Sequence, residues 1–294
     1  MSLPVPGVVG VGAMGMGVVR SLRRHGLPAI ARDIRSEAMD EAAALGAATA
    51  ASSADLARRV DVAILLVVDD RQIDDVLFGA DGAAGAFRPG AIVVVSSTVD
   101  PRYVAALVPR LAPLGVSVVD APVSGGPAKA AAGTMTMMVA GDAAARTRCA
   151  PLFERIAGPV FVVGERPGDA MTFKIVNNLL AAANLAAGAE ALALARRAGI
   201  DAAKALEVID ASSGASWIVA DRMARELRGD RGVRAATRIL AKDVGLAAKL
   251  ADEVGAHAPF AHLASDAFRR AVDAGYGDED DAAMLRYFEG RGEG

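Results

Sequence analysis

The most constraining feature of this sequence is a glycine-rich turn close to its start. Gly10, Gly12 and Gly15 form the pattern G-x-G-x-x-G directly after an apolar, β-branched run. In a strand–turn–helix unit, the first glycine permits a tight turn, the second lets a pyrophosphate approach the backbone, and the third lets helix and strand pack closely. The pattern therefore predicts a parallel α/β fold that binds a dinucleotide. The residues expected at the phosphates are Gly10, Gly12, Ala13, Met14 and Gly15.

The first half of the chain alternates short β-branched runs with Ala-rich amphipathic stretches. This pattern is typical of parallel strands joined by crossover helices, and helices are expected to open near Asp70, Asp100 and Asp142. It predicts a Rossmann-type, doubly wound parallel sheet. The expected strands are Pro6–Val11, Pro28–Asp33, Val62–Val68, Ala91–Ser96, Val116–Asp120, Met135–Ala140 and Val160–Val163.

The second half of the chain has the spacing of long helices. At 294 residues the chain exceeds the roughly 250 that one core usually serves, so we expect two domains. These are a dinucleotide-binding Rossmann domain, residues 1–165, and an all-helical substrate and oligomerisation domain, residues 166–294. The first helix would extend about 40 Å at 1.5 Å per residue and join the two domains. The expected helices are Met171–Ala198, Ala202–Ser212, Ala235–Glu253 and Phe260–Ala274.

Charge and hydropathy argue against macromolecular and membrane partners. The formal net charge is -3, with Lys and Arg scattered rather than clustered, so no basic footprint for nucleic acid or an anionic membrane is expected. Asn184, Glu190 and the pair Arg196-Arg197 interrupt the Ala-rich run that approaches the roughly 20 residues of a membrane span. We therefore expect a small-molecule substrate.

Cysteine and histidine usage limits the chemistry further. Cys149 is the only cysteine, so no intrachain disulfide is possible and a reducing cytoplasm is the expected location. No Cys/His/Asp spacing suggests a bound metal. His25, His257 and His262 lie outside every glycine-rich motif, so a histidine base is not expected.

The cofactor is expected to be NAD rather than NADP. Asp33 closes the second strand about 20 residues after the glycine turn, where a carboxylate accepts hydrogen bonds from the ribose diol and repels a 2′-phosphate. Arg32 and Arg35 flank it, and either would reach a 2′-phosphate if its side chain turned inward. NADP is therefore the less favoured alternative.

Two further strand ends carry polar groups. Ser124, Gly125 and Gly126 follow one strand and offer a hydroxyl and consecutive backbone N–H groups, which suit a carboxylate. An ordinary tight turn explains the glycines equally well. Ser96-Ser97-Thr98 lies at the equivalent edge of an earlier strand and faces the nicotinamide side or caps a helix with Asp100.

Polar residues also interrupt two of the apolar helices. Lys174 and Asn178 lie one turn apart on the first long helix, so they share a face, and Asn177 lies beside them. A lysine snorkelling at a helix start is the structural alternative. Lys242-Asp243 lies on a later helix. It either brings a second ammonium group, with its own counter-ion, to the cleft or forms an ion pair at the surface.

Together these motifs resemble the β-hydroxyacid dehydrogenase family, of the 3-hydroxyisobutyrate dehydrogenase type, over nearly the whole chain. Several segments, among them Val95–Thr98 and Ala215–Trp217, look most like its L-threonate dehydrogenase branch, whereas Asn177-Asn178 is the arrangement of the hydroxyisobutyrate type. The motifs that carry the resemblance are Gly10–Gly17, Asp120–Gly126, Gly168 with Lys174–Asn178, Lys242-Asp243 and Gly275–Asp280.

The resemblance implies NAD-dependent hydride transfer to or from a small hydroxy acid by a homodimer or homotetramer. Lys174 would be the acid/base, its pKa lowered by burial and by nearby positive charge. Asn178 would orient the reacting oxygen. The substrate carboxylate would bind at Ser124, Gly125 and Gly126, and the cofactor would be contacted by Thr98 and Lys242.

Three alternatives share the scaffold. An imine reductase usually carries another residue at the position of Lys174, and a 6-phosphogluconate dehydrogenase has a larger helical domain. A non-catalytic dinucleotide-binding module would not need Lys174 and Asn178. The expected substrate is therefore a short hydroxy acid, or the corresponding aldehyde or keto acid, with its identity and the direction of reaction open.

Overall fold

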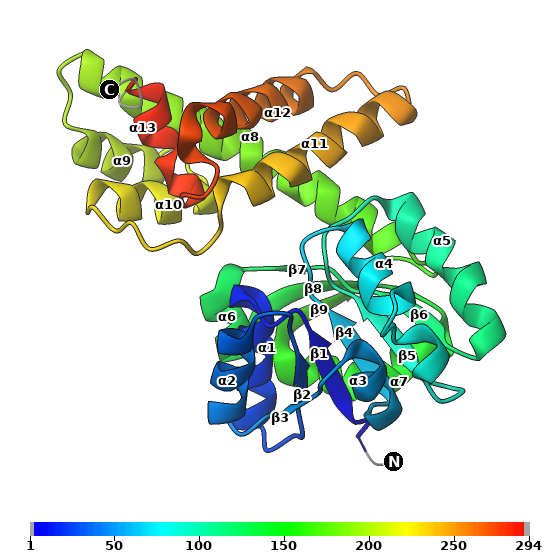
Figure 1. Ribbon diagram of the computed structural model, residues 1–294. Coiled ribbons are helices and arrows are strands. Elements are labelled where there is room, and N and C mark those ends of the chain that lie inside the picture. The colour runs from blue at the N-terminus through cyan, green and yellow to red at the C-terminus, as the bar shows by residue number, and fades with distance from the viewer. Residues whose placement is uncertain (1–2, 291–294) are drawn as a thin grey trace. The chain divides into compact units, whose positions relative to one another are not determined.

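The computed structural model describes residues 3–290, which fold into two compact units that divide between Lys174 and Ile175 (Figure 1). The first unit is an α/β sheet and the second is helical. Helix α8, Asp169–Arg197, contains the boundary between the units, because its first residues belong to the first. The predicted fold class, a Rossmann-type sheet followed by an all-helical part, is confirmed.

The first unit contains, among the described residues, one nine-stranded sheet. Its order is β3-β2-β1-β4-β5-β6-β8-β7, with β9 also pairing with β8. From β3 to β6 every pair is parallel, and the order reverses between β1 and β4, the position where such sheets bind ligands. The strands are β1 Pro6–Val9, β2 Ile30–Arg32, β3 Ala48–Thr49, β4 Val62–Leu65, β5 Ile92–Val95, β6 Ser117–Asp120, β7 Val123–Ser124, β8 Met135–Gly141 and β9 Ala157–Val162.

Strand β8 departs from the expected parallel arrangement, because it runs antiparallel to both β6 and β7. The connection from β7 to β8, residues 125–134, is shorter than the dozen or so residues that a parallel crossover needs. The chain therefore returns antiparallel to β7 through this short connection.

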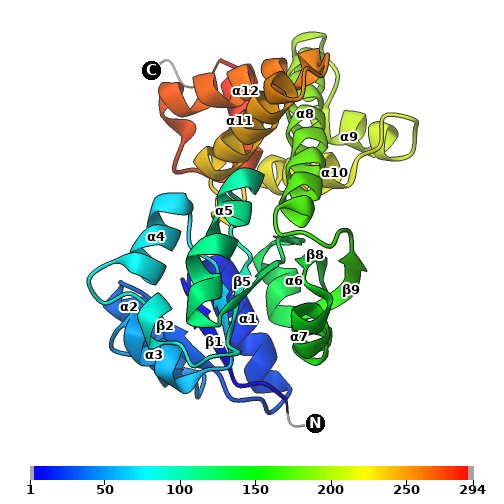
Figure 2. The same cartoon turned by 90° about the vertical axis from the view of Figure 1, so that its right-hand side faces the viewer.

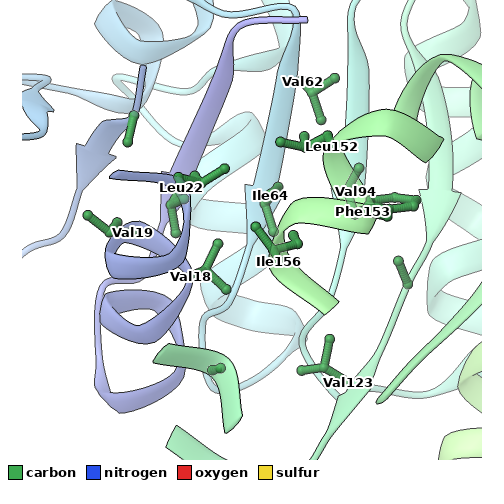
Figure 3. Packing of buried hydrophobic residues seen from close by; sticks show 14 of the residues in the cluster. Val18, Val19, Leu22, Val62, Ile64, Val94, Val123, Leu152, Phe153 and Ile156 are labelled. Carbon is green, nitrogen blue, oxygen red and sulfur yellow. The ribbon is translucent and has the colours of Figure 1, made fainter. Parts of the chain in front are cut away.

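Helices cover both faces of this sheet. Helix α1 packs on α2, α6 and α7, and Figure 3 shows Val18 and Leu22 of α1 with Phe153 of α7 beside Ile64 and Val94 of the sheet. The helices are α1 Ala13–Arg24, α2 Ser36–Ala44, α3 Ser53–Arg59, α4 Asp70–Phe78, α5 Pro101–Leu111, α6 Gly126–Ala132 and α7 Ala143–Ile156.

The second unit packs helices around the apolar side of α8, with α11 and α12 side by side (Figure 2). Four helices were expected, and α10 and the short α13 are additional ones that the sequence pattern did not indicate. Short turns lie at Val272–Tyr276 and Asp281–Ala283. After α8 the helices are α9 Ala202–Asp210, α10 Trp217–Leu227, α11 Thr237–Glu253, α12 Pro259–Ala271 and α13 Met284–Phe288.

Helix α8 is unusually apolar. By length and composition it could cross a membrane, with a mean hydropathy of 1.4 over its most apolar window, of which 39% is buried within the chain. The core helix of a soluble protein meets the same criterion. Ala182, Leu185 and Leu192 of α8 are fully buried in the core of the second unit.

Candidate functional site

The parallel strands bring four of the expected motifs to one edge of the sheet. In the register, Val9 pairs with both Arg32 and Leu65, and Val95 pairs with Asp120. The residues that follow these strand ends therefore lie along the same carboxyl edge. They are the Gly10 turn after β1, Asp33 after β2, Ser96–Thr98 after β5 and the segment from Ala121 to Gly126 after β6.

The glycine turn has the backbone geometry that a dinucleotide requires. Gly10 has φ +86, and a Cβ there would lie 2.7 Å from the carbonyl oxygen of Leu66. A Cβ on Gly15 would collide with the carbonyl oxygen of Gly10. A Cβ on Gly12, in contrast, would meet only Arg35, at 3.8 Å, so this position is open to a ligand. Gly10 and Gly15 therefore allow close packing of the backbone, and Gly12 leaves room for a ligand.

A cleft of about 540 Å³ opens beside this turn. Gly12 precedes α1, and no side chain caps the first turn of this helix. Its first N–H groups are therefore not occupied by a side-chain cap, and helix N-termini of this kind favour a phosphate. Gly12, Ala13, Arg35 and Pro127 are among the lining residues. The residues present therefore fit the dinucleotide that the motif predicts.

Asp33 is 8% exposed and held by several donors. Oδ2 accepts the N–H of Val11 at 2.9 Å, and Oδ1 accepts the backbone N–H and Nε of Arg35 at 3.0 and 3.1 Å. Burial alone would raise the pKa of this carboxyl, but these hydrogen bonds and the Arg35 charge outweigh burial and lower it below 3.8. Asp33 is therefore ionised at neutral pH.

The two serines after β5 donate hydrogen bonds to backbone carbonyl oxygens within the fold. Ser96 Oγ donates to the carbonyl oxygen of Ala121 at 2.8 Å, and Ser97 Oγ donates to that of Leu65 at 3.3 Å. Both serines are buried, whereas Thr98 is partly exposed. Thr98 is thus the member of this segment that a ligand can reach.

The segment after β6 forms the predicted turn. Val123 and Ser124 pair with β8, and Gly125 and Gly126 then take φ values of +124 and +76. Helix α6 begins at Gly126, and the same turn leads directly into it. Consecutive residues in such conformations point their N–H groups in a common direction, which is an arrangement that binds anions.

Helix α8 places Lys174 within its first turns, and the side chain is 8% exposed. The helix start is fixed by a residue far away in sequence, because Oδ2 of Asp120 accepts the N–H groups of Gly168 at 2.8 Å and Met171 at 2.9 Å. Asp120 is fully buried, and burial raises its pKa to about 6. Asn178 lies one turn beyond Lys174 on the same helix.

Within the second unit, Asn178 belongs to a polar cluster. Its Nδ2 donates to Oδ2 of Asp243 at 2.6 Å, and its Oδ1 accepts from Nδ2 of Asn177 at 3.1 Å. Lys242 pairs with Asp243 Oδ1 at 2.7 Å. Asn178 and Asp243 are 6% and 4% exposed, whereas Lys242 keeps 27% of its side chain accessible.

The structure thus brings the expected site residues together in two groups, one in each unit. The first unit carries Gly10, Gly12, Ala13, Met14, Gly15, Asp33, Thr98, Ser124, Gly125, Gly126 and Lys174, and the second carries Asn178 and Lys242. The sequence assigned no role to Asp120 beyond its motif, and gave Asp243 only that of a counter-ion. Within residues 3–290 no cluster of three or more His, Cys, Asp or Glu could hold a metal.

Comparison with known proteins identifies the two units in turn. Residues 6–164 match the family model of the NAD-binding domain of 6-phosphogluconate dehydrogenase. Residues 168–288 match the NAD-binding domain of NADP-dependent 3-hydroxyisobutyrate dehydrogenase. The fold and its glycine turn therefore define a nicotinamide-dependent dehydrogenase.

Individual relatives narrow this class. An L-threonate dehydrogenase of Cupriavidus necator is 43% identical over 97% of this chain and 96% of its own. An NAD-dependent L-serine dehydrogenase of Pseudomonas aeruginosa is 31% identical over 96% of each chain. A crystal structure described as a 3-hydroxyisobutyrate dehydrogenase, from Salmonella typhimurium, is 41% identical, covers 96% of this chain and 99% of its own, and superposes with a TM-score of 0.90.

The chain belongs to the β-hydroxyacid dehydrogenase family, and it is an enzyme of the NAD(P)-dependent hydroxy acid dehydrogenase class. The predicted similarity to the L-threonate dehydrogenase branch is confirmed by the relatives above 40% identity.

Proposed function

We propose that this protein oxidises a short polyhydroxy acid of the L-threonate type with NAD, and that Lys174 is the acid/base. The role of Lys174 rests on one observation. Its side chain is 8% exposed and lies near the start of α8, and Asp120, the last residue of β6, holds this helix start through two hydrogen bonds. The 39–43% identical relatives named L-threonate dehydrogenase support the substrate class.

In the proposed reaction, each residue of the candidate site has a role. When NAD is bound, its nicotinamide ring supplies the acceptor for a hydride from the carbinol carbon. In oxidation, Lys174 in its neutral form takes the hydroxyl proton at Nζ, and in reduction its ammonium returns that proton. Ser124 and the N–H groups of Gly125 and Gly126 bind the substrate carboxylate. Asn178 orients the reacting oxygen through its side-chain amide.

The cofactor is proposed to be NAD. An ionised Asp33 accepts hydrogen bonds from a ribose diol and repels a 2′-phosphate. Two arginines, Arg20 and Arg35, line the cleft and would favour the phosphate. Arg20 is paired with Glu41, and the guanidinium of Arg35 is paired with the Asp33 carboxylate. Thr98 and Lys242 are proposed as further cofactor contacts.

We also propose that the protein is a homodimer or homotetramer that associates through α8, in the cytoplasm. Val176, Leu180 and Leu194 of this helix are 57%, 62% and 67% exposed, although they are large and apolar. A second copy would remove these side chains from water, which explains the high hydropathy of α8. Leu180→Glu should lower the mass measured by light scattering after gel filtration.

The proposed activity is tested by a substrate panel. We would follow NADH formation at 340 nm with L-threonate, D-threonate, 3-hydroxyisobutyrate, L-serine and D-glycerate, each with NAD and with NADP. The proposal expects the highest kcat/KM with L-threonate and NAD. Turnover confined to a cyclic imine with a reduced cofactor would contradict it.

A further inference from the structure

Position 168, which precedes the first residue of α8, cannot cap that helix with its own side chain. Gly168 has φ +105, and a Cβ there would lie 2.6 Å from the carbonyl oxygen of Pro101. Helices usually satisfy their first N–H groups with a Ser, Thr, Asp or Asn at this position. Because the backbone is pressed against Pro101, only glycine fits, and the acceptor must come from elsewhere in the fold.

Asp120 supplies this acceptor from 48 residues upstream. It is the last residue of β6, and its fully buried carboxylate accepts the N–H of Gly168 and that of Met171 through one oxygen, Oδ2. The other oxygen, Oδ1, is buried and has no hydrogen-bond partner within the described residues. One oxygen therefore carries both contacts to the helix.

The end of β6 also leads into the turn of Ser124, Gly125 and Gly126, which is proposed to bind the substrate carboxylate. Ser96 Oγ holds the carbonyl oxygen of Ala121 at 2.8 Å, and the N–H of Met138 donates to the carbonyl oxygen of Pro122 at 3.1 Å. Val123 and Ser124 are then paired with β8. The backbone from Asp120 to Ser124 is thus fixed at each step.

Lys174 follows Met171 by about one helical turn, so any displacement of the first turn moves the lysine with it. Acid/base chemistry is sensitive to such displacement, because a shift of about 1 Å at a reacting group can cost about a hundredfold in rate. A fixed link between the start of α8 and the Ser124 turn therefore has a direct catalytic consequence.

We propose that Asp120 is a positioning residue for hydride transfer, which sets the first turn of α8, and with it Lys174, against the turn formed by Ser124, Gly125 and Gly126. This inference rests on the proposed function of Lys174. It assigns Asp120 no contact with substrate or cofactor.

Three variants separate positioning from helix stability. Asp120→Ala removes both hydrogen bonds. Asp120→Asn can keep them, because its carbonyl oxygen can take the place of Oδ2 and its amide the place of the unpartnered Oδ1. Asp142→Ala is the matched control, since Asp142 caps α7 through the N–H groups of Ala144 and Ala145 at 3.0 and 3.1 Å. It removes two helix-capping hydrogen bonds of similar length, at an exposed carboxylate, from a helix that carries none of the proposed site residues.

Two measurements are made on the full-length protein. The first is amide hydrogen exchange of peptides that span Gly168–Met171, which needs no substrate. The second is kcat and KM with the best substrate of the panel, together with NADH binding by fluorescence. For Asp120→Ala we expect faster exchange in this segment and a kcat lowered about a hundredfold, with NADH affinity unchanged. Asp120→Asn should stay within about tenfold of the wild type, and Asp142→Ala should match it.

Two results would overturn the inference. One is unchanged exchange at Gly168–Met171 in Asp120→Ala, and the other is an equal loss of kcat in Asp120→Ala and Asp142→Ala. A wild-type enzyme that turns over no hydroxy acid would instead refute the proposed function, and the exchange data would still decide whether Asp120 fixes the start of α8.

Discussion

The side-chain amide of Asn178 donates to Asp243, Nδ2 to Oδ2 at 2.6 Å, although 65 residues separate the two positions. An ionised carboxylate accepts hydrogen bonds and donates none, so it fixes which end of the amide faces it. The NH2 group of Asn178 must point at Asp243, and Oδ1 must point away. Asp243 also pairs with Lys242, so one carboxylate holds both of the site residues predicted in the second unit.

Asp243→Asn should therefore lower activity without unfolding the protein. A hydrogen bond to a charged group contributes about 1.5–3 kcal/mol, so we expect kcat/KM to fall by about tenfold to a hundredfold. Asp252→Asn on the same helix is the control, since the Asp252 carboxylate pairs with His262 in a solvent-exposed contact. Steady-state kinetics on both variants measure the difference. Equal activity in the two variants would show that Asp243 does not orient Asn178.

Asp33 and Arg35 should determine cofactor preference together. Asp33→Ser removes the charge that repels a 2′-phosphate and releases Arg35 to bind one. We expect the ratio of kcat/KM with NAD to that with NADP to fall at least about tenfold, which corresponds to about 1.4 kcal/mol. Adding Arg35→Ala should remove the gain with NADP. A ratio that stays constant across these variants would contradict the assignment of Asp33.

Asp120 should make stability depend on pH in the acid range. Burial raises its pKa from 3.8 to about 6, so between these pH values the folded state holds a proton that the unfolded state releases. The stabilisation from this proton is complete below about pH 3.8 and is lost as pH rises through about 6.

The test compares the wild type with Asp120→Asn, which cannot ionise. As the pH rises from 4 to 7, the unfolding free energy of the wild type should fall by up to about 3 kcal/mol relative to that of Asp120→Asn. Because the other groups are common to both proteins, they cancel in this difference. Urea unfolding at several pH values measures it, and a constant difference would mean that Asp120 titrates normally in the folded state.

Much of the sheet was predictable because its strands are continuous β-branched runs. Strands β4 and β5 fall inside the expected ranges Val62–Val68 and Ala91–Ser96, since strands buried on both faces carry no polar residues to confuse the pattern. Strands β3 and β7 were missed. Each spans only two residues, which is too short for any periodicity to show.

Helix α10 escaped prediction for a different reason. Its buried face combines apolar Ile218, Val219 and Met223 with Arg225 and Glu226, at 3% and 6% exposure, so charged residues interrupt the apolar pattern. Arg225 is accommodated because Asp221 lies on the same helix and Asp280 pairs with it from a distant turn. Such compensation depends on tertiary contacts and leaves no local signal.

In the candidate site, too, features with a local sequence signal were predictable and features that depend on tertiary contacts were not. The glycine turn and Asp33 were predictable, because chain geometry places them at fixed intervals along one strand–helix–strand unit. The role of Asp120 was not, because its partners, Gly168 and Met171, lie beyond five further elements of the chain, β7, α6, β8, α7 and β9. A buried carboxylate at the end of a strand is visible in the sequence, but its hydrogen-bond partners are known only from the fold.

Proton transfer by Lys174 is tested most directly by the kcat of Lys174→Ala and Lys174→Arg with the best hydroxy acid of the panel. Arginine keeps the charge but does not deprotonate in proteins, so it cannot act as the base in oxidation. We predict that both variants bind NADH like the wild type and lose at least about a hundredfold in kcat, as expected for a missing general base. Lys204→Ala, which removes a surface lysine paired with Glu207, should keep full activity. If Lys174→Arg retained wild-type kcat, the lysine would act only through its charge and the proposed acid/base role would be wrong.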